Sequence, residues 1–274
     1  MSAATRLIYF ASLATALAAP PADAEFIATD HLRSALVAES TAAVPGQTIR
    51  LGLLLEHDPH WHTYWRNPGD AGMPTRIEIE APAGVAVGAL QWPAPQRFEV
   101  GGIVNFGYAG RTLLPVTLTI PEHVGPGPLI VRARASWLVC EEECIPGRAE
   151  YRLALPLAAA SEADARWRED FVALSSALPQ PLPVQARYRI DGQQLRFEFP
   201  AGSLPAGFAA WEWFPTQPQL IDHAGAPTWA LTDGGLRASL PLSPYFASAP
   251  DTAEIVLVHE DGAWSFSAQH APAN

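Results

Sequence analysis

The sequence predicts an all-β protein with two immunoglobulin-like β-sandwich domains, joined by a short linker that contains a helix. Across the 274 residues, 27 prolines and 20 glycines separate short runs in which apolar and polar residues alternate. Such runs are typical of strands linked by turns. Turn signals roughly every 8 to 15 residues favour a sandwich. One segment, 161–178, instead has apolar residues at helical spacing, which predicts a helix between two sheet domains.

Residues 1–24 predict a signal peptide. Arg6 supplies the positive charge, residues 7–19 are apolar, and Ala22-Asp23-Ala24 forms a small-x-small cleavage site. The apolar stretch is too short to cross a bilayer, which needs about 20 residues. We therefore expect cleavage near Ala24 and an exported protein without direct membrane insertion.

The charge of the chain argues against nucleic acid and anionic lipid as partners. The formal net charge is −11, and no run of basic residues interrupts the acidic composition. Proteins that bind phosphate backbones carry a basic patch or stripe. We therefore predict no nucleic-acid partner.

The first sandwich is expected over 25–158 and the helical linker over 159–183. In the linker, Ser161 can cap the helix and Pro179, Pro181 and Pro183 end it. Alternation predicts the strands of the first sandwich at 49–56, 76–80, 113–120, 129–139 and 149–157.

The second sandwich is expected over 184–274. The dipeptides Asp191-Gly192, Asp233-Gly234 and Asp261-Gly262 are hairpin turn signals. The predicted strands are 184–190, 194–199, 209–214, 229–231, 235–242, 253–258 and 264–268. This half has no cysteine and no cluster of catalytic groups, so its role stays open.

Cys140 and Cys144 are the only cysteines, and they lie around the end of the predicted strand 129–139. In an exported protein such a pair tends to be oxidised. A disulfide that closes so short a ring stabilises a fold by only about 2 kcal/mol. Reactivity is therefore a better explanation than stability. An inert structural disulfide remains an alternative, whereas a closed zinc site needs four ligands.

Three glutamates, Glu141 to Glu143, separate the two cysteines. Negative charge beside a thiol disfavours the thiolate, which is the reactive form. We expect the reduced pair to react slowly with random oxidants and to exchange when a partner docks. That behaviour suits a carrier of electrons.

Four ordered blocks resemble the family of N-terminal periplasmic domains of the thiol:disulfide interchange protein DsbD, and most closely its suppressor-of-copper-sensitivity (ScsB-like) relatives. The resemblance covers about 51–157. The blocks are WHTYWRNPGDAGMPT (61–75), QWPAPQRFEVGGIVNFGYAG (91–110), LLPVTL (113–118) and ASWLVCEEECIPG (135–147). The segment WEWFPTQPQLIDHAGAP (211–227) also resembles the second sandwich of these relatives.

The resemblance implies an immunoglobulin-like fold with a redox-active disulfide in the periplasm and no cofactor. Such domains take electrons from a membrane-embedded thiol reductant and pass them to periplasmic thioredoxin-like oxidoreductases, in the context of cytochrome c assembly or copper tolerance. Cys144 would form the mixed disulfide and Cys140 would resolve it. We expect the membrane reductant to be a separate protein.

The family's cap loop would map to about 104–108 in this sequence. Asn105, Phe106 and Tyr108 would then shield the sulfurs from bulk oxidants. The spacing of the cysteines is shorter than in the best-known member of the family, which leaves the geometry of the loops open.

Two further groups are candidates for binding. His57, His60 and His62 have a spacing that can bind copper or zinc, although Asp58-Pro59 also predicts a solvated turn that enters a strand. The aromatic residues Trp61, Tyr64 and Trp65 line either a partner groove or the core. Two alternatives to electron transfer therefore stay open, namely an exported scaffold protein with an inert disulfide and a copper-binding protein.

Overall fold

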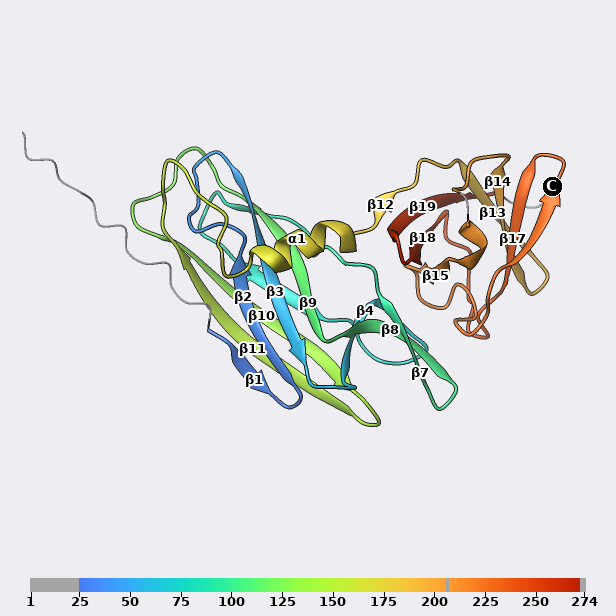
Figure 1. Cartoon of the computed structure of the whole chain (residues 1–274), viewed down its shortest axis with the longest axis horizontal. Coiled ribbons are helices and arrows are strands. Elements are labelled where there is room, and N and C mark those ends of the chain that lie inside the picture. Colours follow the sequence, from blue (N-terminus) through green and yellow to red (C-terminus); the bar gives the residue numbers. More distant parts are fainter. Residues whose placement is uncertain (1–24, 206, 272–274) are drawn as a thin grey trace, which may run out of the picture.

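The computed structural model describes residues 25–205 and 207–271, and it confirms the all-β class. The predicted signal peptide lies outside the described residues. Strands form two lobes, and the only α-helix of the described chain, α1 (Arg168–Ala177), lies along the first lobe (Figure 1).

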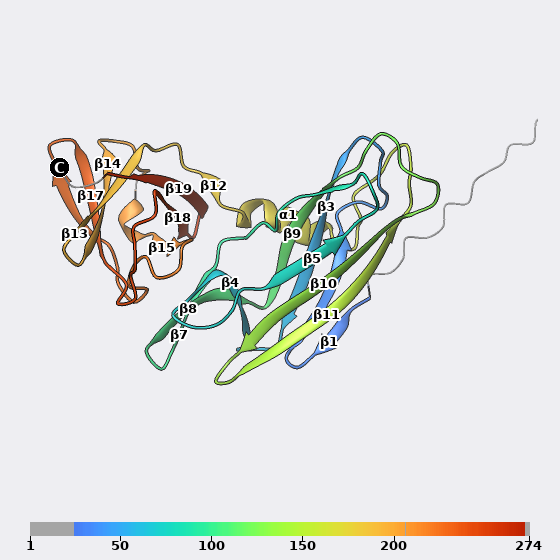
Figure 2. The ribbon, with the colours of Figure 1, turned by 180° about the vertical axis from the view of Figure 1, so that it is seen from behind.

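Two sheets face each other in the first domain. One has the strand order β1-β2-β3-β9-β6 and the other β11-β10-β4-β8-β7, with β5 paired to β10; Figure 2 shows β5, β10 and β11 from the outer side. The bounds are β1 (Ile27–Thr29), β2 (Leu32–Ala38), β3 (Thr48–His57), β4 (His62–Gly69), β5 (Arg76–Glu80), β6 (Ala86–Val87), β7 (Gln96–Val100), β8 (Ile103–Ala109), β9 (Arg111–Thr119), β10 (Leu129–Cys140) and β11 (Cys144–Leu155).

Strands β2, β4 and β8 were not among the predicted strands. Both faces of β2 and of the first half of β4 are buried, so their sequences are almost continuously apolar or uncharged. Such strands lack the alternation that reveals a half-exposed strand. Alternation did predict β10, in which every second residue from Leu129 to Val139 faces the core.

Helix α1 belongs to the first domain rather than to a free connector. Trp167, Phe171 and Leu174 pack on the outer face of β2, β3 and β9, against Ala35, Val37, Leu54 and Leu113. The expected cap at Ser161 is wrong. The Ser161 hydroxyl accepts a hydrogen bond from the Ala42 amide (3.0 Å), and the helix begins after Trp167 without a side-chain cap.

The second domain is one hydrogen-bonded sheet that folds back on itself. Its strand order is β15-β18-β19-β13-β14-β17-β16, with β12 beside β19. Trp213 and Trp229 lie on the two outermost strands, and their rings are 5.8 Å apart, so the ends of the sheet meet over a common core. The bounds are β12 (Gln180–Pro181), β13 (Ala186–Asp191), β14 (Gln194–Pro200), β15 (Glu212–Pro215), β16 (Thr228–Thr232), β17 (Gly235–Pro241), β18 (Thr252–His259) and β19 (Gly262–His270), with a 3-10 turn at Phe208–Ala210.

The second domain contacts the first at β4 and β8. Phe214 of β15 belongs to the core of the first domain, where its ring is 5.0 Å from Phe106 and 6.3 Å from Trp65. The buried Asn67 side chain donates a hydrogen bond to the Pro215 carbonyl (2.8 Å). The second domain is therefore anchored to the sheet that also holds the cysteines.

Candidate functional site

The two cysteines form a disulfide at the tip of the β10–β11 hairpin. The register pairs Cys140 with Cys144, and their Cα atoms are 4.2 Å apart. On its other side, Cys140 pairs with His62 of β4. The amide of Glu141 donates a hydrogen bond to the Glu143 carbonyl (3.2 Å) and closes the turn. The hairpin thus brings the two sulfurs together without a contribution from distant parts of the chain.

The two cysteines differ in exposure. Cys140 is 2% exposed, whereas Cys144 and the three glutamates of the turn are exposed. A thiol from solution or from a partner protein therefore meets Cys144 first.

Tyr64 of β4 contacts both sulfurs. Its hydroxyl donates a hydrogen bond to the Cys140 Sγ at 2.9 Å and lies 3.5 Å from the Cys144 Sγ. The residue is 1% exposed, and burial raises the pKa of its hydroxyl above the usual 10.0. The hydroxyl therefore keeps its proton at neutral pH and acts as a donor.

The segment 70–75, which follows β4, holds the Tyr64 ring in place. Gly72 has φ +100°, and an added Cβ would overlap the ring of Tyr64, so this backbone lies directly against the phenol. Asp70 fixes the start of the segment: its amide donates to the Val104 carbonyl (2.9 Å) and its carboxylate accepts from the Val104 amide (2.8 Å). The Ala71 amide donates to the Asn105 side chain (3.2 Å).

Two further rings, those of His62 and Phe98, extend a row of packed side chains from Tyr64 to β7. The His62 ring lies edge-on to Tyr64, with centroids 5.3 Å apart, and stacks on Phe98 at 4.3 Å. Phe98 is partly buried in β7. Phe98 was not among the predicted site residues, although it lies in the block 91–110 and alternates with the charged neighbours Arg97 and Glu99.

The prediction of a cap loop at 104–108 is wrong, because residues 104–108 form the middle of strand β8. Phe106 and Tyr108 belong to the core of the first domain. The Tyr108 hydroxyl donates to the Pro93 carbonyl (2.8 Å) rather than to a sulfur, and burial raises its pKa well above 10.0. Asn105 supports the segment 70–75 through its hydrogen bond with Ala71.

The predicted partner groove at Trp61, Tyr64 and Trp65 is not a surface of the structure. All three side chains are buried, and Trp65 is fully enclosed. Trp61 is stacked on His31 with ring centroids 3.8 Å apart. Only Tyr64 among them reaches the sulfurs.

The three histidines named as metal candidates do not converge. The His57 ring nitrogens contact the Gly110 carbonyl (2.8 Å) and the Thr63 hydroxyl (3.0 Å), and burial lowers its pKa to about 4. His60 is exposed in the turn with φ +74°, whereas His62 is buried, which lowers its pKa. Within the described residues, the ligand atoms that do gather belong to His259, Glu260 and Asp261 at the β18–β19 turn.

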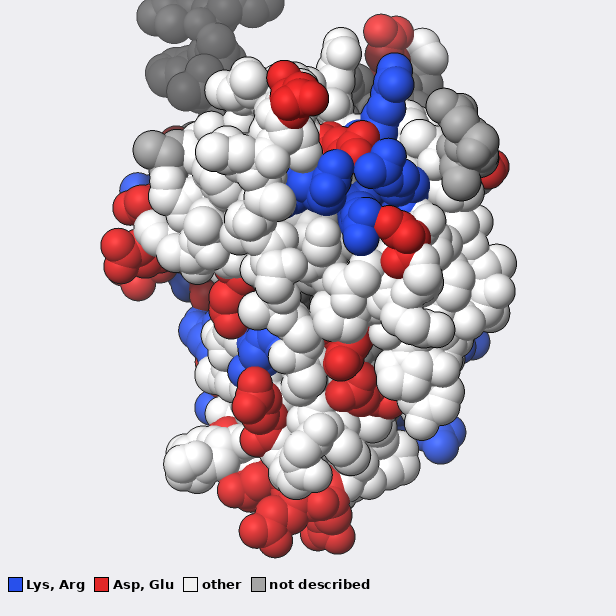
Figure 3. Space-filling model, turned by 90° about the vertical axis from the view of Figure 1, so that its right-hand side faces the viewer, with Lys and Arg blue, Asp and Glu red and all other residues white. Residues whose placement is uncertain are grey.

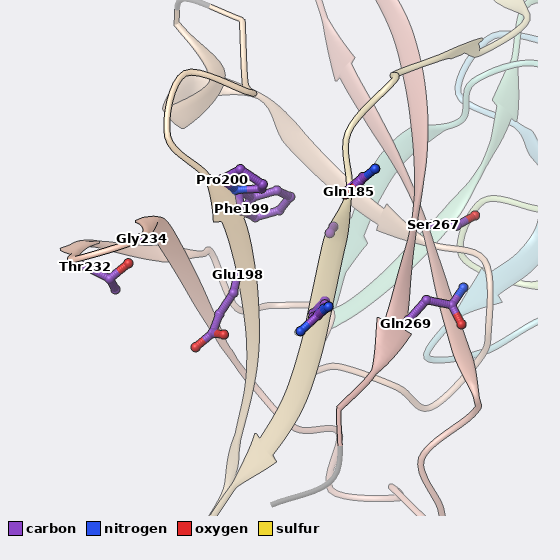
Figure 4. A pocket seen from close by; sticks show the side chains of 10 residues that line it. Gln185, Glu198, Phe199, Pro200, Thr232, Gly234, Ser267 and Gln269 are labelled. Atoms are coloured by element: carbon purple, nitrogen blue, oxygen red, sulfur yellow. The ribbon is translucent and has the colours of Figure 1, made fainter.

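The outer face of the second domain carries basic side chains and a shallow hollow. Arginines gather over β13, β14 and β17 in Figure 3, and they comprise Arg187, Arg189, Arg196 and Arg237. Glu198 pairs with Arg189 (3.0 Å) and Arg237 (3.8 Å). The hollow lies between β13, β14 and β19 (Figure 4), and no cysteine or histidine lines it. Its only hydroxyl groups belong to Thr232 and Ser267, with no histidine beside them to act as a base, so the disulfide is the better candidate site.

No helix of the described residues is long and apolar enough to cross a membrane. Among curated proteins, no sequence matches the chain. Among solved structures, the N-terminal periplasmic domain of ScsB from Proteus mirabilis is similar, with 16% identity, coverage of 92% of this chain and 100% of that chain, and a TM-score of 0.66. This similarity shows the fold of both domains.

A second solved structure, the GAE domain of yeast GGA1, has 14% identity and covers 47% of this chain and 96% of its own, but its TM-score of 0.28 carries no argument. The family described as "Thiol:disulfide interchange protein DsbD, N-terminal" matches residues 33–156. This range contains both cysteines and Tyr64. Residues 33–156 therefore match the DsbD N-terminal domain, and the ScsB similarity agrees with this assignment.

Proposed function

We propose that this protein is a periplasmic module that relays electrons through reversible opening of the Cys140–Cys144 disulfide. One observation carries the proposal: a disulfide in a domain of the DsbD family has one exposed sulfur, one buried sulfur and a tyrosine hydroxyl that donates to the buried one. The periplasmic location rests on the predicted signal peptide and on the periplasmic origin of the similar ScsB domain.

The reaction begins when a thiolate of a reduced donor protein attacks the Sγ of Cys144. The bond between Cys144 and Cys140 breaks, a mixed disulfide joins Cys144 to the donor, and Cys140 leaves as a thiolate. The second thiol of the donor then attacks its own mixed-disulfide sulfur and releases Cys144. Two electrons have moved to the module, the donor now holds a disulfide, and protons from solvent complete the two thiols.

The second half of the cycle runs these steps in reverse on an oxidised acceptor. The Cys144 thiolate attacks the acceptor disulfide, and Cys140 then displaces the acceptor from Cys144. Cys140 and Cys144 need no large movement because the hairpin register keeps their Cα atoms 4.2 Å apart. The module ends oxidised and the acceptor ends reduced.

Tyr64 assists the step in which Cys140 carries negative charge. A hydrogen bond to a charged group contributes about 1.5–3 kcal/mol. The Tyr64 hydroxyl already lies 2.9 Å from the sulfur that becomes the thiolate, so no rearrangement is required. The interaction is stronger with the thiolate than with the disulfide, and it therefore lowers the barrier.

The surroundings of the disulfide make exchange selective. Tyr64 contacts the sulfurs on the buried side and is backed by the rings of His62 and Phe98, while Glu141 to Glu143 surround the exposed side with negative charge. Negative charge opposes the approach of anionic thiolates and the ionisation of the reduced thiols. A docked protein that screens this charge removes both effects, so exchange with a specific partner is favoured over reaction with small thiols.

The family resemblance supports a proposal for the class of partners. We propose a membrane-embedded thiol reductant, encoded separately, as the donor and periplasmic thioredoxin-like oxidoreductases as acceptors. Cytochrome c assembly and copper tolerance are the two settings in which such acceptors would work. No cofactor is needed, because both half-reactions use cysteine sulfur alone.

Trapping of mixed disulfides tests this function. In cells that produce the Cys140→Ala variant, Cys144 should form stable disulfide-linked complexes with thioredoxin-like proteins, since the resolving thiol is missing. The matched control is Cys144→Ala, which leaves only the buried sulfur and should trap nothing. Absence of any reducible complex with Cys140→Ala would instead support a scaffold protein with an inert disulfide.

A further inference from the structure

One residue of the second domain, His223, contacts the Asp70 side chain at the start of the segment 70–75. This histidine lies between β15 and β16, is 4% exposed, and lies against the first domain. Its Nδ1 is 2.7 Å from a carboxylate oxygen of Asp70, and its ring lies edge-on to Phe106, with centroids 4.9 Å apart. Asp70 satisfies the buried Nδ1, whereas the buried Nε2 has no hydrogen-bond partner among the described residues, so the position of the ring depends on the contact with Asp70.

The backbone of His223 makes a second contact, to the strand that carries Phe98. The guanidinium of Arg97 donates a hydrogen bond to the His223 carbonyl and lies over the rings of Phe106 (5.5 Å) and Phe214 (5.9 Å). Arg97 and Phe98 are neighbours in β7 and point to opposite faces. His223 therefore holds both segments that support the row of packed side chains beside the disulfide.

A continuous series of contacts leads from His223 to the sulfurs. His223 holds Asp70, and Asp70 begins the segment in which the Gly72 backbone lies against the Tyr64 ring. The Tyr64 hydroxyl donates to Cys140. Each step is a packed or hydrogen-bonded contact, and such contacts can carry coupling between distant sites.

We propose that His223 is a positioning residue for disulfide exchange and that the second domain serves to keep the Tyr64 hydroxyl on the leaving sulfur. The inference rests on the proposed exchange reaction at Cys140 and Cys144. It gives the second domain a role that its own sequence does not reveal.

The direction of the effect follows from the exposure of the two cysteines. Release of the segment 70–75 would uncover the disulfide and would also free Tyr64 from Cys140. Uncovering adds little, because the attacked residue, Cys144, is already exposed. Loss of the donor to the leaving thiolate is therefore the larger effect, and exchange slows.

The test measures the rate at which dithiothreitol reduces the purified, oxidised full chain, by alkylation of the released thiols. His223→Ala should slow reduction by at least about threefold, and His223→Asn, whose amide can replace the Nδ1–H donor, should restore most of the rate. Glu254→Gln is the matched control. It weakens the Arg66–Glu254 contact between the domains (3.0 Å) away from the segment 70–75 and should leave the rate unchanged.

Combination with Tyr64→Phe separates positioning from general destabilisation. If His223 acts through the Tyr64 hydroxyl, His223→Ala should cause no further slowing in the Tyr64→Phe background, since the two effects share one interaction. Additive slowing, or a wild-type rate for His223→Ala, would overturn the inference. If His223→Ala does not fold, Asp70→Asn is measured in the same way, with the same two outcomes.

The two proposals fail independently. Reduction by dithiothreitol needs no partner, so non-additive slowing supports the positioning role even if no mixed disulfide is trapped in cells. Conversely, successful trapping together with a wild-type rate for His223→Ala retains the relay and removes the role of the second domain.

Discussion

Removal of one oxygen atom, in Tyr64→Phe, probes the proposed chemistry without a change in shape. The ring stays between Gly72 and His62, and the hydrogen bond to the Cys140 Sγ at 2.9 Å is lost. The hydroxyl contacts only the two sulfurs among the described residues, so no other donor or acceptor is left without its partner.

The expected loss of rate follows from the charge on the leaving sulfur. A hydrogen bond to a full thiolate contributes about 2 kcal/mol. With about half of the charge developed in the transition state, in line with Brønsted slopes for thiol exchange, the barrier rises by about 1 kcal/mol. The rate then falls about fivefold.

The assay is reduction of the oxidised protein by dithiothreitol at constant pH, with released thiols measured by alkylation. Phe98→Leu is the control, because it removes a ring from the same row of packed side chains without a contact to sulfur. A Tyr64→Phe rate equal to that of wild type, or above it, would refute the assignment of the hydroxyl as a donor to the leaving thiolate.

Three further substitutions test the supports of the site. Gly72→Ala places a Cβ against the Tyr64 ring at φ +100°; it should destabilise the fold by about 1–3 kcal/mol in urea unfolding, and unchanged stability would contradict the close contact. Burial lowers the His57 pKa from 6.5 to about 4. Between these two pH values the unfolded chain binds a proton on His57 and the folded protein does not. The free energy of unfolding therefore falls as the pH drops from about 6.5 to about 4. The full pKa shift corresponds to about 3 kcal/mol of folding stability, which partial exposure of His57 reduces to about 1–2 kcal/mol. His57→Gln should remove this loss of stability between about pH 7 and 4.5. An unaltered pH dependence of stability in the variant would contradict the assignment to His57. Phe171→Ala should cost about 3–5 kcal/mol, because Phe171 packs on the first domain, whereas a cost below about 1 kcal/mol would mean that α1 is a free connector.

The sequence predicted those parts of the fold that depend on local pattern. The alternation that ends at Cys140 predicted β10 to within one residue of its end, and the hairpin turn signals in the second half match the β13–β14, β16–β17 and β18–β19 turns. Strands β2 and β4 have no clear alternation because both of their faces are buried. Helix α1 covers the outer face of β2, and Phe98 and the segment 70–75 pack on the outer side chains of β4. Their burial on both faces is a tertiary property.

The candidate site was predicted in part for a similar reason. Cys140 and Cys144 are close in sequence and were found, but the contact between Tyr64 and Cys140 spans 76 residues. Tyr64 was named for a partner groove, and its place beside the sulfurs depends on how β4 pairs with β10. The contact between His223 and Asp70 spans 153 residues and two domains, and no local pattern in either segment predicts it.

The reduction potential of the disulfide bears most directly on the proposed relay. Equilibration of the purified protein with glutathione buffers, followed by alkylation of free thiols, gives the potential of the pair. A carrier that exchanges electrons with periplasmic partners should have a value near about −200 mV, whereas a value well below about −300 mV would make the bond a permanent structural link.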